Sequence, residues 1–374
     1  MVFASHLFLA FLGVTLLLYW QVAKGGAGAA KAFLIAASIV FYASWMLEFL
    51  PLLLVSILIN YSLAIGIRHY RGKLFGTVLY TLGCLGNVGL LGYFKYTAFI
   101  LGQWNALFSP PIPIPEIILP IGISFFTFQQ IGFLTDMRQG KVEHLTFWHY
   151  VFMVVIFPHL IAGPIVSQRD MLPQLAARTD WQLRADQVAI GLTIFAIGLF
   201  KKTVLMDPQV PYIDNIFDAA RNGHTIGFLD GWIAAFGYGF QIYFDFSAYS
   251  DMAVGLAFIF GLTLPMNFFS PYKATSIRDF WRRWHITLSR FLRDLIFIPL
   301  GGSRNGLGIA LFAVIATMTI GGLWHGAGWT FVIWGLLHGL YLAANHLFSA
   351  LFPRFPENGA TRLLGGILTF LAVT

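Results

Sequence analysis

The sequence carries very little charge for its length. Only 10% of its 374 residues are Asp, Glu, Lys or Arg, whereas soluble domains carry about 25%. No such residue occurs at positions 305–353. Hydrophobic residues make up 58% of the chain and recur in long runs from end to end, more than a soluble core can bury. This composition excludes a soluble enzyme and predicts an all-α polytopic membrane protein.

Cysteine is almost absent. Cys84 is the single cysteine, so an internal disulfide and a cysteine-based metal site are both excluded. Its position in the apolar run 74–94 predicts an inert thiol that serves packing. Histidine pairs with H-x-x-x-H or H-E-x-x-H spacing are missing as well. We therefore predict no metal site and no bound cofactor.

Apolar runs long enough to cross a membrane recur along the chain. They predict about 10–12 transmembrane or re-entrant helices in a single membrane-embedded domain, residues 1–374. The expected spans are 3–20, 32–47, 49–66, 74–94, 117–135, 147–163, 187–206, 228–244, 247–264, 307–323 and 329–348. A last run, 363–374, is too short to span.

The positive charge lies in loops between these runs. The net charge of +7 is explained by retention of Lys and Arg in the cytoplasm, which requires no nucleic-acid partner. The alternation of basic loops predicts an N-terminus outside the cell. Arg169 breaks the alternation after the stretch 152–166, where Pro158 and Pro164 interrupt a helix. This stretch is predicted to be a re-entrant hairpin that lines a cavity.

Residues 276–302 have the pattern of a basic amphipathic helix at the cytoplasmic surface. His285 shares the apolar face with Trp281, and arginines occupy the opposite face. One interpretation is an anchor in anionic lipid headgroups. The other is that Trp281, Arg282 and Arg283 bind the phosphates of a cytosolic donor.

Three polar residues interrupt the apolar segment 238–255. Asp245, Ser250 and Asp251 lie within or between predicted spans, and buried carboxylates are rare without partners. They could form a structural network that ties helix ends to the arginines. They could also form a proton path in a proton-coupled transporter, although we find no internal repeat of the kind from which many transporters are built.

His325 is a polar ring in the uncharged segment, within the sequence GGLWHGAGWTF at 321–331. A polar group at membrane depth is a candidate functional residue. The alternative is that the glycines place His325 in a short turn at the membrane surface, with Trp324 and Trp329 in the interfacial belt.

Four stretches together resemble the membrane-bound O-acyltransferase family, particularly its bacterial alginate O-acetyltransferase-like branch. In order, they are FPHLIAGPI, FDFSAYSDMAVG, DFWRRWHITLSRFLRD and GGLWHGAGWTF. The resemblance implies a central tunnel, with His325 as the catalytic base and His285 as the second signature position. His285 would orient the donor or stabilise the carbonyl oxygen, and Asp245, Ser250 and Asp251 would support the site.

The resemblance also implies a function in a bacterial inner membrane. The expected reaction moves acetyl groups from a cytosolic donor, acetyl-CoA or another acyl thioester, across the bilayer to an exported polysaccharide such as alginate or cellulose. A secreted or periplasmic esterase-like protein is the expected partner. The alternative is transfer of D-alanine to teichoic acid from a carrier-protein thioester. The chain is shorter than typical alginate-type members, so we expect its C-terminus to be truncated relative to the family.

Overall fold

The computed structural model describes residues 1–142, 145–356 and 358–374, and all regular secondary structure in these ranges is helical. The first half contains α1 (His6–Val22), α2 (Ala27–Met46), α3 (Leu50–His69), α4 (Leu74–Leu91), α5 (Thr97–Leu107), α6 (Ile123–Arg138), α7 (Phe147–Val155), α8 (Phe157–Leu160) and α9 (Gln168–Ala177).

The second half contains fewer but longer helices. They are α10 (Ala185–Phe200), α11 (Val210–Arg221), α12 (Phe228–Ile259), α13 (Ile277–Arg283), α14 (Ile286–Leu292), α15 (Leu307–His325), α16 (Trp329–Leu351) and α17 (Gly359–Val373). Three π-helical segments extend α-helices, at Gly92–Tyr96, Lys201–Met206 and Arg293–Phe297. Short 3₁₀ segments lie at Ala23–Gly25, Leu47–Phe49, Asp207–Gln209 and Pro271–Lys273.

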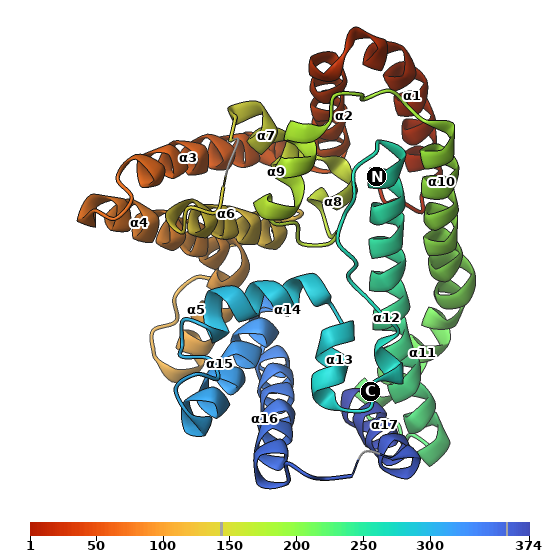
Figure 1. The fold of residues 1–374 in the computed structure, drawn as a ribbon. Helices are drawn as coiled ribbons and strands as arrows, with labels where there is room; N and C mark the ends of the chain where they lie inside the picture. Colours follow the sequence, from red (N-terminus) through yellow and green to blue (C-terminus); the bar gives the residue numbers. More distant parts are fainter. Residues whose placement is uncertain (143–144, 357) are drawn as a thin grey trace.

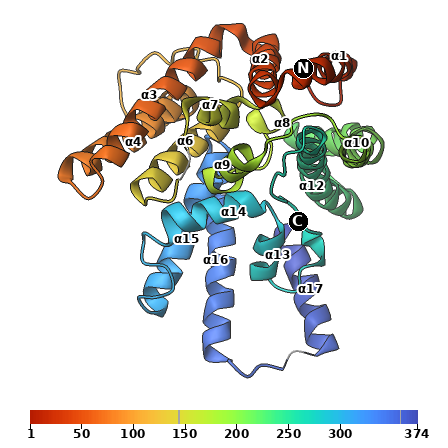
Figure 2. The same ribbon diagram turned by 45° about the horizontal axis from the view of Figure 1, so that its top comes forward.

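The helices form groups around a set of short central elements. In Figure 1, α3, α4 and α6 lie on one side, α10 and α12 run together on the other, and α15 and α16 form a pair below α14. Figure 2, viewed from above, shows α8, α9 and α14 among the longer helices. The site described below lies where the short helices α13 and α14 meet α15 and α16.

The prediction of an all-α polytopic membrane protein is confirmed. Among the described residues, six helical stretches are long and apolar enough to cross a bilayer, and the remaining expected spans are shorter or more polar helices. These six are His6–Gly25, Ala27–His69, Leu74–Leu107, Ala185–Arg221, Leu307–His325 and Trp329–Leu351. Many of their large apolar side chains face outward, as lipid contact requires; Leu17 is 69% exposed and Phe312 63% exposed. The chain is a multi-pass membrane protein.

The prediction of two spans at 228–244 and 247–264 is wrong. One continuous helix, α12, covers Phe228–Ile259. Asp245 and Asp251 suggested a break, but both lie within this helix and pair with lysines of the neighbouring π-helical segment, where Lys202 is shared with Asp207.

The prediction of one amphipathic helix at 276–302 is also wrong. The chain breaks between α13 and α14 at Trp284 and His285, and His285 has the left-handed conformation with φ 41° and ψ 54°. The N–H groups of Ile286 and Thr287 turn to Asn267 at this break. The faces of α13 and α14 therefore do not form one continuous stripe.

The stretch 152–166 is broken, as its prolines predict. α7 ends at Val155, and the four-residue α8 follows after Ile156. The N–H of Phe157 donates to Ser38 Oγ at 3.0 Å, which compensates the backbone group freed by the break. Residues 157–160 are all buried in protein, which is how irregular backbone persists at membrane depth.

Candidate active site

Three histidines line one cavity of about 550 Å³, here called the histidine cavity. His285 comes from the α13–α14 break, His325 ends α15, and His338 lies on α16. The ring centroids of His285 and His325 are 6.4 Å apart. Most of the remaining wall is aromatic, with rings from α6, α12, α13, α15 and α16. The cavity therefore brings together two histidines that are 40 positions apart in the sequence.

His325 is not in a surface turn. It occupies the last turn of α15, its ring is 5.4 Å from that of Trp334, and the neighbouring Trp324 is only 6% exposed. The glycines instead serve close packing. A Cβ on Gly322 would lie 2.3 Å from the carbonyl oxygen of Phe331, so α15 and α16 can approach only with glycine there.

Lys95 and Tyr96 hold the end of α15. Both belong to the π-helical segment Gly92–Tyr96. Lys95 Nζ donates to the carbonyl oxygen of Trp324, and Tyr96 Oη donates to that of Leu323 at 2.7 Å. A cation at a helix C-terminus also interacts favourably with the helix dipole. Lys95 is the charged side chain in the described wall of the histidine cavity.

Sequence reasoning missed Lys95 as a site residue. The available signal was its isolation, because a lysine between two apolar helical stretches is costly unless it faces protein or a cavity.

His285 is held by a residue that sequence reasoning also missed. The side chain is 1% exposed, and Nδ1 lies 3.0 Å from Asn267 Oδ1. Phe246 packs edge-on against its ring at 4.6 Å between centroids. Nε2 has no hydrogen-bond partner among the described residues. No signal in the sequence connects Asn267 to a residue 18 positions away.

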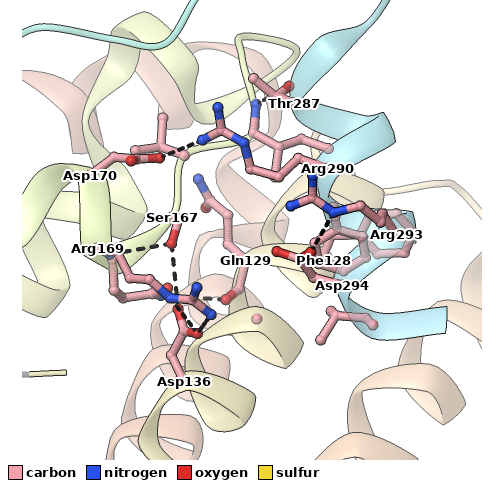
Figure 3. A pocket seen from close by; sticks show the side chains of 16 residues that line it. Phe128, Gln129, Asp136, Ser167, Arg169, Asp170, Thr287, Arg290, Arg293 and Asp294 are labelled. Carbon is pink, nitrogen blue, oxygen red and sulfur yellow. Dashed lines mark hydrogen bonds and ion pairs between the residues drawn. The ribbon is translucent and has the colours of Figure 1, made fainter. Parts of the chain in front are cut away.

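A second, smaller pocket of about 230 Å³ lies beyond the α13–α14 break and is here called the arginine pocket (Figure 3). Ion pairs line it: Arg169 with Asp136, Arg290 with Asp170 at 3.4 Å, and Arg293 with Asp294 at 2.8 Å. Its wall also includes Ile165–Ser167, so the broken stretch 152–166 does line a cavity.

The two pockets are neighbours through the α13–α14 break. His285 lines the histidine cavity, and Thr287, two residues later, lines the arginine pocket. On α6, Phe125 faces the first and Phe128 the second. Both histidines line the aromatic cavity, and His285 is two residues from the wall of the charged pocket.

The residues predicted to bind the donor do not line the arginine pocket. Arg282 is exposed, and Arg283 pairs with Asp279 at 2.9 Å. Trp281 is buried and donates to His338 Nδ1 at 3.3 Å. The helix breaks at His285, and of the arginines in 276–302 those that line the pocket are Arg290 on α14 and Arg293 in its π-helical extension.

The predicted supporting network divides into two parts. Ser250 Oγ accepts from Asn267 Nδ2 at 3.2 Å and so connects to His285. Asp245 pairs with Lys202 at 2.9 Å, and Asp251 pairs with Lys201 at 2.5 Å. Both carboxylates are directed to lysines of α10's π-helical extension, not to the histidines or to arginines.

Within the residues the structure describes, no group of three or more His, Cys, Asp or Glu side chains is placed to hold a metal ion.

The fold and cavity define a polytopic membrane protein with two histidines in an aromatic cavity beside a charged pocket. The sequence model of the membrane-bound O-acyltransferase family matches residues 137–370. The chain belongs to this family and is an O-acyltransferase.

The curated relatives differ in the polymer named. The chain is 42% identical to the peptidoglycan O-acetyltransferase of Helicobacter pylori, over 91% of this chain and 68% of that protein. It is also 42% identical to the probable alginate O-acetylase of Azotobacter vinelandii, over 92% of this chain and 68% of the relative. The teichoic acid D-alanyltransferase of Bacillus subtilis is more distant, at 26% identity over 70% of this chain and 68% of the enzyme.

Proposed function

We propose that the chain transfers acetyl groups from a cytosolic thioester to hydroxyl groups of an exported polysaccharide. The main support is the pair of histidines, His285 and His325, whose ring centroids are 6.4 Å apart in one cavity of an O-acyltransferase. The similarity to an alginate O-acetylase and a peptidoglycan O-acetyltransferase supports acetyl as the group and a polysaccharide as the acceptor.

His325 is the general base in this proposal. It takes the proton of the acceptor hydroxyl as the oxygen forms a bond to the acyl carbon. The carbon–sulfur bond then breaks, and the thiolate leaves with the bonding electrons and recovers the proton. Imidazole suits this role because its ordinary pKa of about 6.5 lies near neutrality. Such base catalysis contributes roughly 10²–10⁴-fold in rate.

The negative charge that develops on the acyl oxygen needs a donor. The Lys95 ammonium is suited to it, because it lies on the wall of the histidine cavity beside the carbonyl of Trp324. Fixed charges aimed at a developing oxyanion act strongly in a site that excludes water.

The arginine pocket is the proposed donor side. Asp136, at its wall, lies near the end of α6, where the chain enters the basic loop with Arg138 and Lys141. Basic loops favour the cytoplasm, so the pocket would face the cytosolic thioester. The same proposal includes an N-terminus outside, a location in a bacterial inner membrane, and a periplasmic esterase-like partner on the acceptor side.

The test is the ester content of the polymers made by a host strain. The gene is deleted and then restored as wild type, as His325→Ala, or as His346→Ala. His346 is a matched control, since it lies on α16 outside the described wall of the cavity. We expect acetyl ester on exported polysaccharide with the wild type and the control only.

The same samples separate the possible acceptors. Acetyl ester confined to peptidoglycan would assign that polymer, and D-alanine ester on teichoic acid would assign the D-alanyl reaction. Equal acetylation in the deletion strain and the restored strain would refute the proposal.

A further inference from the structure

Asn267 lies at the centre of the break between α13 and α14. It is 2% exposed and belongs to the segment that follows α12. Its backbone oxygen accepts from the N–H of Ile286 at 2.9 Å, and Oδ1 accepts from the N–H of Thr287 at 3.3 Å. Asn267 thus satisfies N–H groups at the start of α14, which leaves His285 free to adopt its left-handed conformation.

The orientation of the Asn267 amide follows from its neighbours. The backbone N–H of Thr287 is a permanent donor, so it faces the oxygen and not the nitrogen. The Thr287 hydroxyl accepts from the N–H of Ile165 at 3.0 Å and donates its own hydrogen to Oδ1 at 2.9 Å. On the other side, Nδ2 donates to Ser250 Oγ at 3.2 Å.

The same oxygen assigns the proton of His285. Nδ1 lies 3.0 Å from Oδ1, an acceptor, so Nδ1 carries the hydrogen. A neutral imidazole has only one N–H, so Nε2 has a lone pair. That atom has no partner among the described residues, and the ring lines the histidine cavity.

We propose that Asn267 is a positioning residue that fixes His285 as the Nδ1–H tautomer, with the lone pair of Nε2 beside His325. When His325 takes the hydroxyl proton, its N–H donates to this lone pair, directly or through one water molecule. His285 thus stabilises the imidazolium. A neutral His285 in this tautomer has no hydrogen to donate to a carbonyl oxygen. The inference rests on the proposed function, because it requires His325 to become protonated during transfer.

The tautomer is measured by ¹⁵N NMR of the full chain in lipid vesicles, with histidine as the labelled residue. His285→Gln identifies the His285 signals by their loss. We expect a protonated Nδ1 and an unprotonated Nε2 in the wild type, and a mixture of tautomers in Asn267→Leu. A protonated Nε2 on neutral His285 in the wild type would overturn the proposal.

The kinetic arm uses two substitutions at Asn267. Asn267→Leu should lower the transfer rate by about 10- to 100-fold, the range expected when one partner of a buried hydrogen bond is lost. Asn267→Asp keeps the acceptor oxygen and should restore most of the rate. Its negative charge favours a proton on the His285–His325 pair. A higher pH is then needed to free the base, so the acidic limb of the pH–rate profile should move to higher pH.

Asn87→Leu is the matched control. Asn87 is also buried, at 5% exposure, and exchanges amide hydrogen bonds with Asn60 in the contact between α3 and α4. This variant should lose stability with no change in the pH profile. If Asn267→Leu keeps the wild-type rate and tautomer while His285→Gln is inactive, the inference fails and the proposed function stands. If His285→Gln keeps the wild-type rate, His285 has no part in the reaction.

Discussion

Lysines occur in two contrasting environments in the membrane-embedded part of the chain, and both are on π-helical segments. Lys201 and Lys202, on Lys201–Met206, each pair with a carboxylate of α12. Lys95, on Gly92–Tyr96, binds the carbonyl oxygen of Trp324 and lies 3.4 Å from Ser124 Oγ. No carboxylate pairs with Lys95 within the described ranges.

The difference separates structural from functional charge. A paired lysine and aspartate carry no net charge and can hold two helices together inside a bilayer. An unpaired ammonium remains available to stabilise negative charge that develops on a bound substrate. Lys95 has no paired carboxylate among the described residues and lines the same cavity as His325. Lys201 and Lys202 are paired and lie on the π-helical extension of α10.

Among changes to these lysines and their partners, removing the unpaired charge should lower the rate most. Lys95→Met keeps the side-chain length and should lower the rate of acyl transfer by about 10²–10³-fold, the range seen when one oxyanion donor is lost. The measurement is transfer from a labelled acyl thioester in membranes with equal amounts of protein. Lys24→Met is the control, since Lys24 bonds Gln21 on the exposed surface. If the Lys95→Met protein is as active as the control, Lys95 has no catalytic role and does not differ in function from the paired lysines.

Breaking a pair should affect stability more than chemistry. Asp251→Leu leaves Lys201 without its carboxylate and should destabilise the fold by less than the roughly 3–5 kcal/mol of a fully buried pair, because the two side chains are 25% and 35% exposed. The double variant Lys201→Leu/Asp251→Leu removes both charges and should recover most of that loss. Thermal unfolding in detergent measures the stability, and activity per folded molecule should stay near that of the wild type. Loss of activity in a stable double variant would assign this pair a catalytic role.

The position of His325 depends on the close contact between α15 and α16. Gly322→Ala would place a methyl group 2.3 Å from the Phe331 carbonyl oxygen and 2.7 Å from Gly335 Cα. Overpacking of this kind typically costs about 1–3 kcal/mol, and it should also lower activity by moving the end of α15. Gly308→Ala, in the same helix, meets no atom within 4 Å and should be neutral or slightly stabilising. Equal unfolding temperatures for the two variants would contradict this packing.

The smallest effect is expected outside both pockets. Arg282→Lys should leave the dependence on donor concentration unchanged, because Arg282 is exposed and does not line the arginine pocket. Arg290→Lys should raise the donor concentration needed, because lysine cannot supply the planar paired donors of a guanidinium. The reverse pattern, in a donor titration at constant protein, would place donor binding at α13.

The helical membrane architecture was predictable because long apolar runs leave few alternatives in a bilayer. The break at 152–166 was predictable from Pro158 and Pro164. The two failures have one cause. At Asp245 and at His285, the partner is distant in the sequence: Lys202 pairs with Asp245 inside the continuous α12, and Asn267 accepts from the backbone N–H of Thr287 at the turn. Periodicity within one segment contains no information about such partners.

The site was predictable only where its signals are local in the sequence. The unusual setting of His325 and the motif around His285 are local, and the structure brings both rings into one cavity. Arg282 and Arg283 do not line the arginine pocket, because the helix that was expected to continue through His285 breaks there. Lys95 and Asn267 became visible only when segments far apart in the chain came together.

The most direct test of the account is the rate at which the purified chain, in lipid vesicles, transfers labelled acetyl from a thioester to a polysaccharide hydroxyl. Wild type, His325→Ala and His346→Ala are compared at equal amounts of folded protein. We expect a loss of about 10²–10⁴-fold for His325→Ala and an unchanged rate for His346→Ala. A His325→Ala protein that transfers acetyl at the wild-type rate would contradict it.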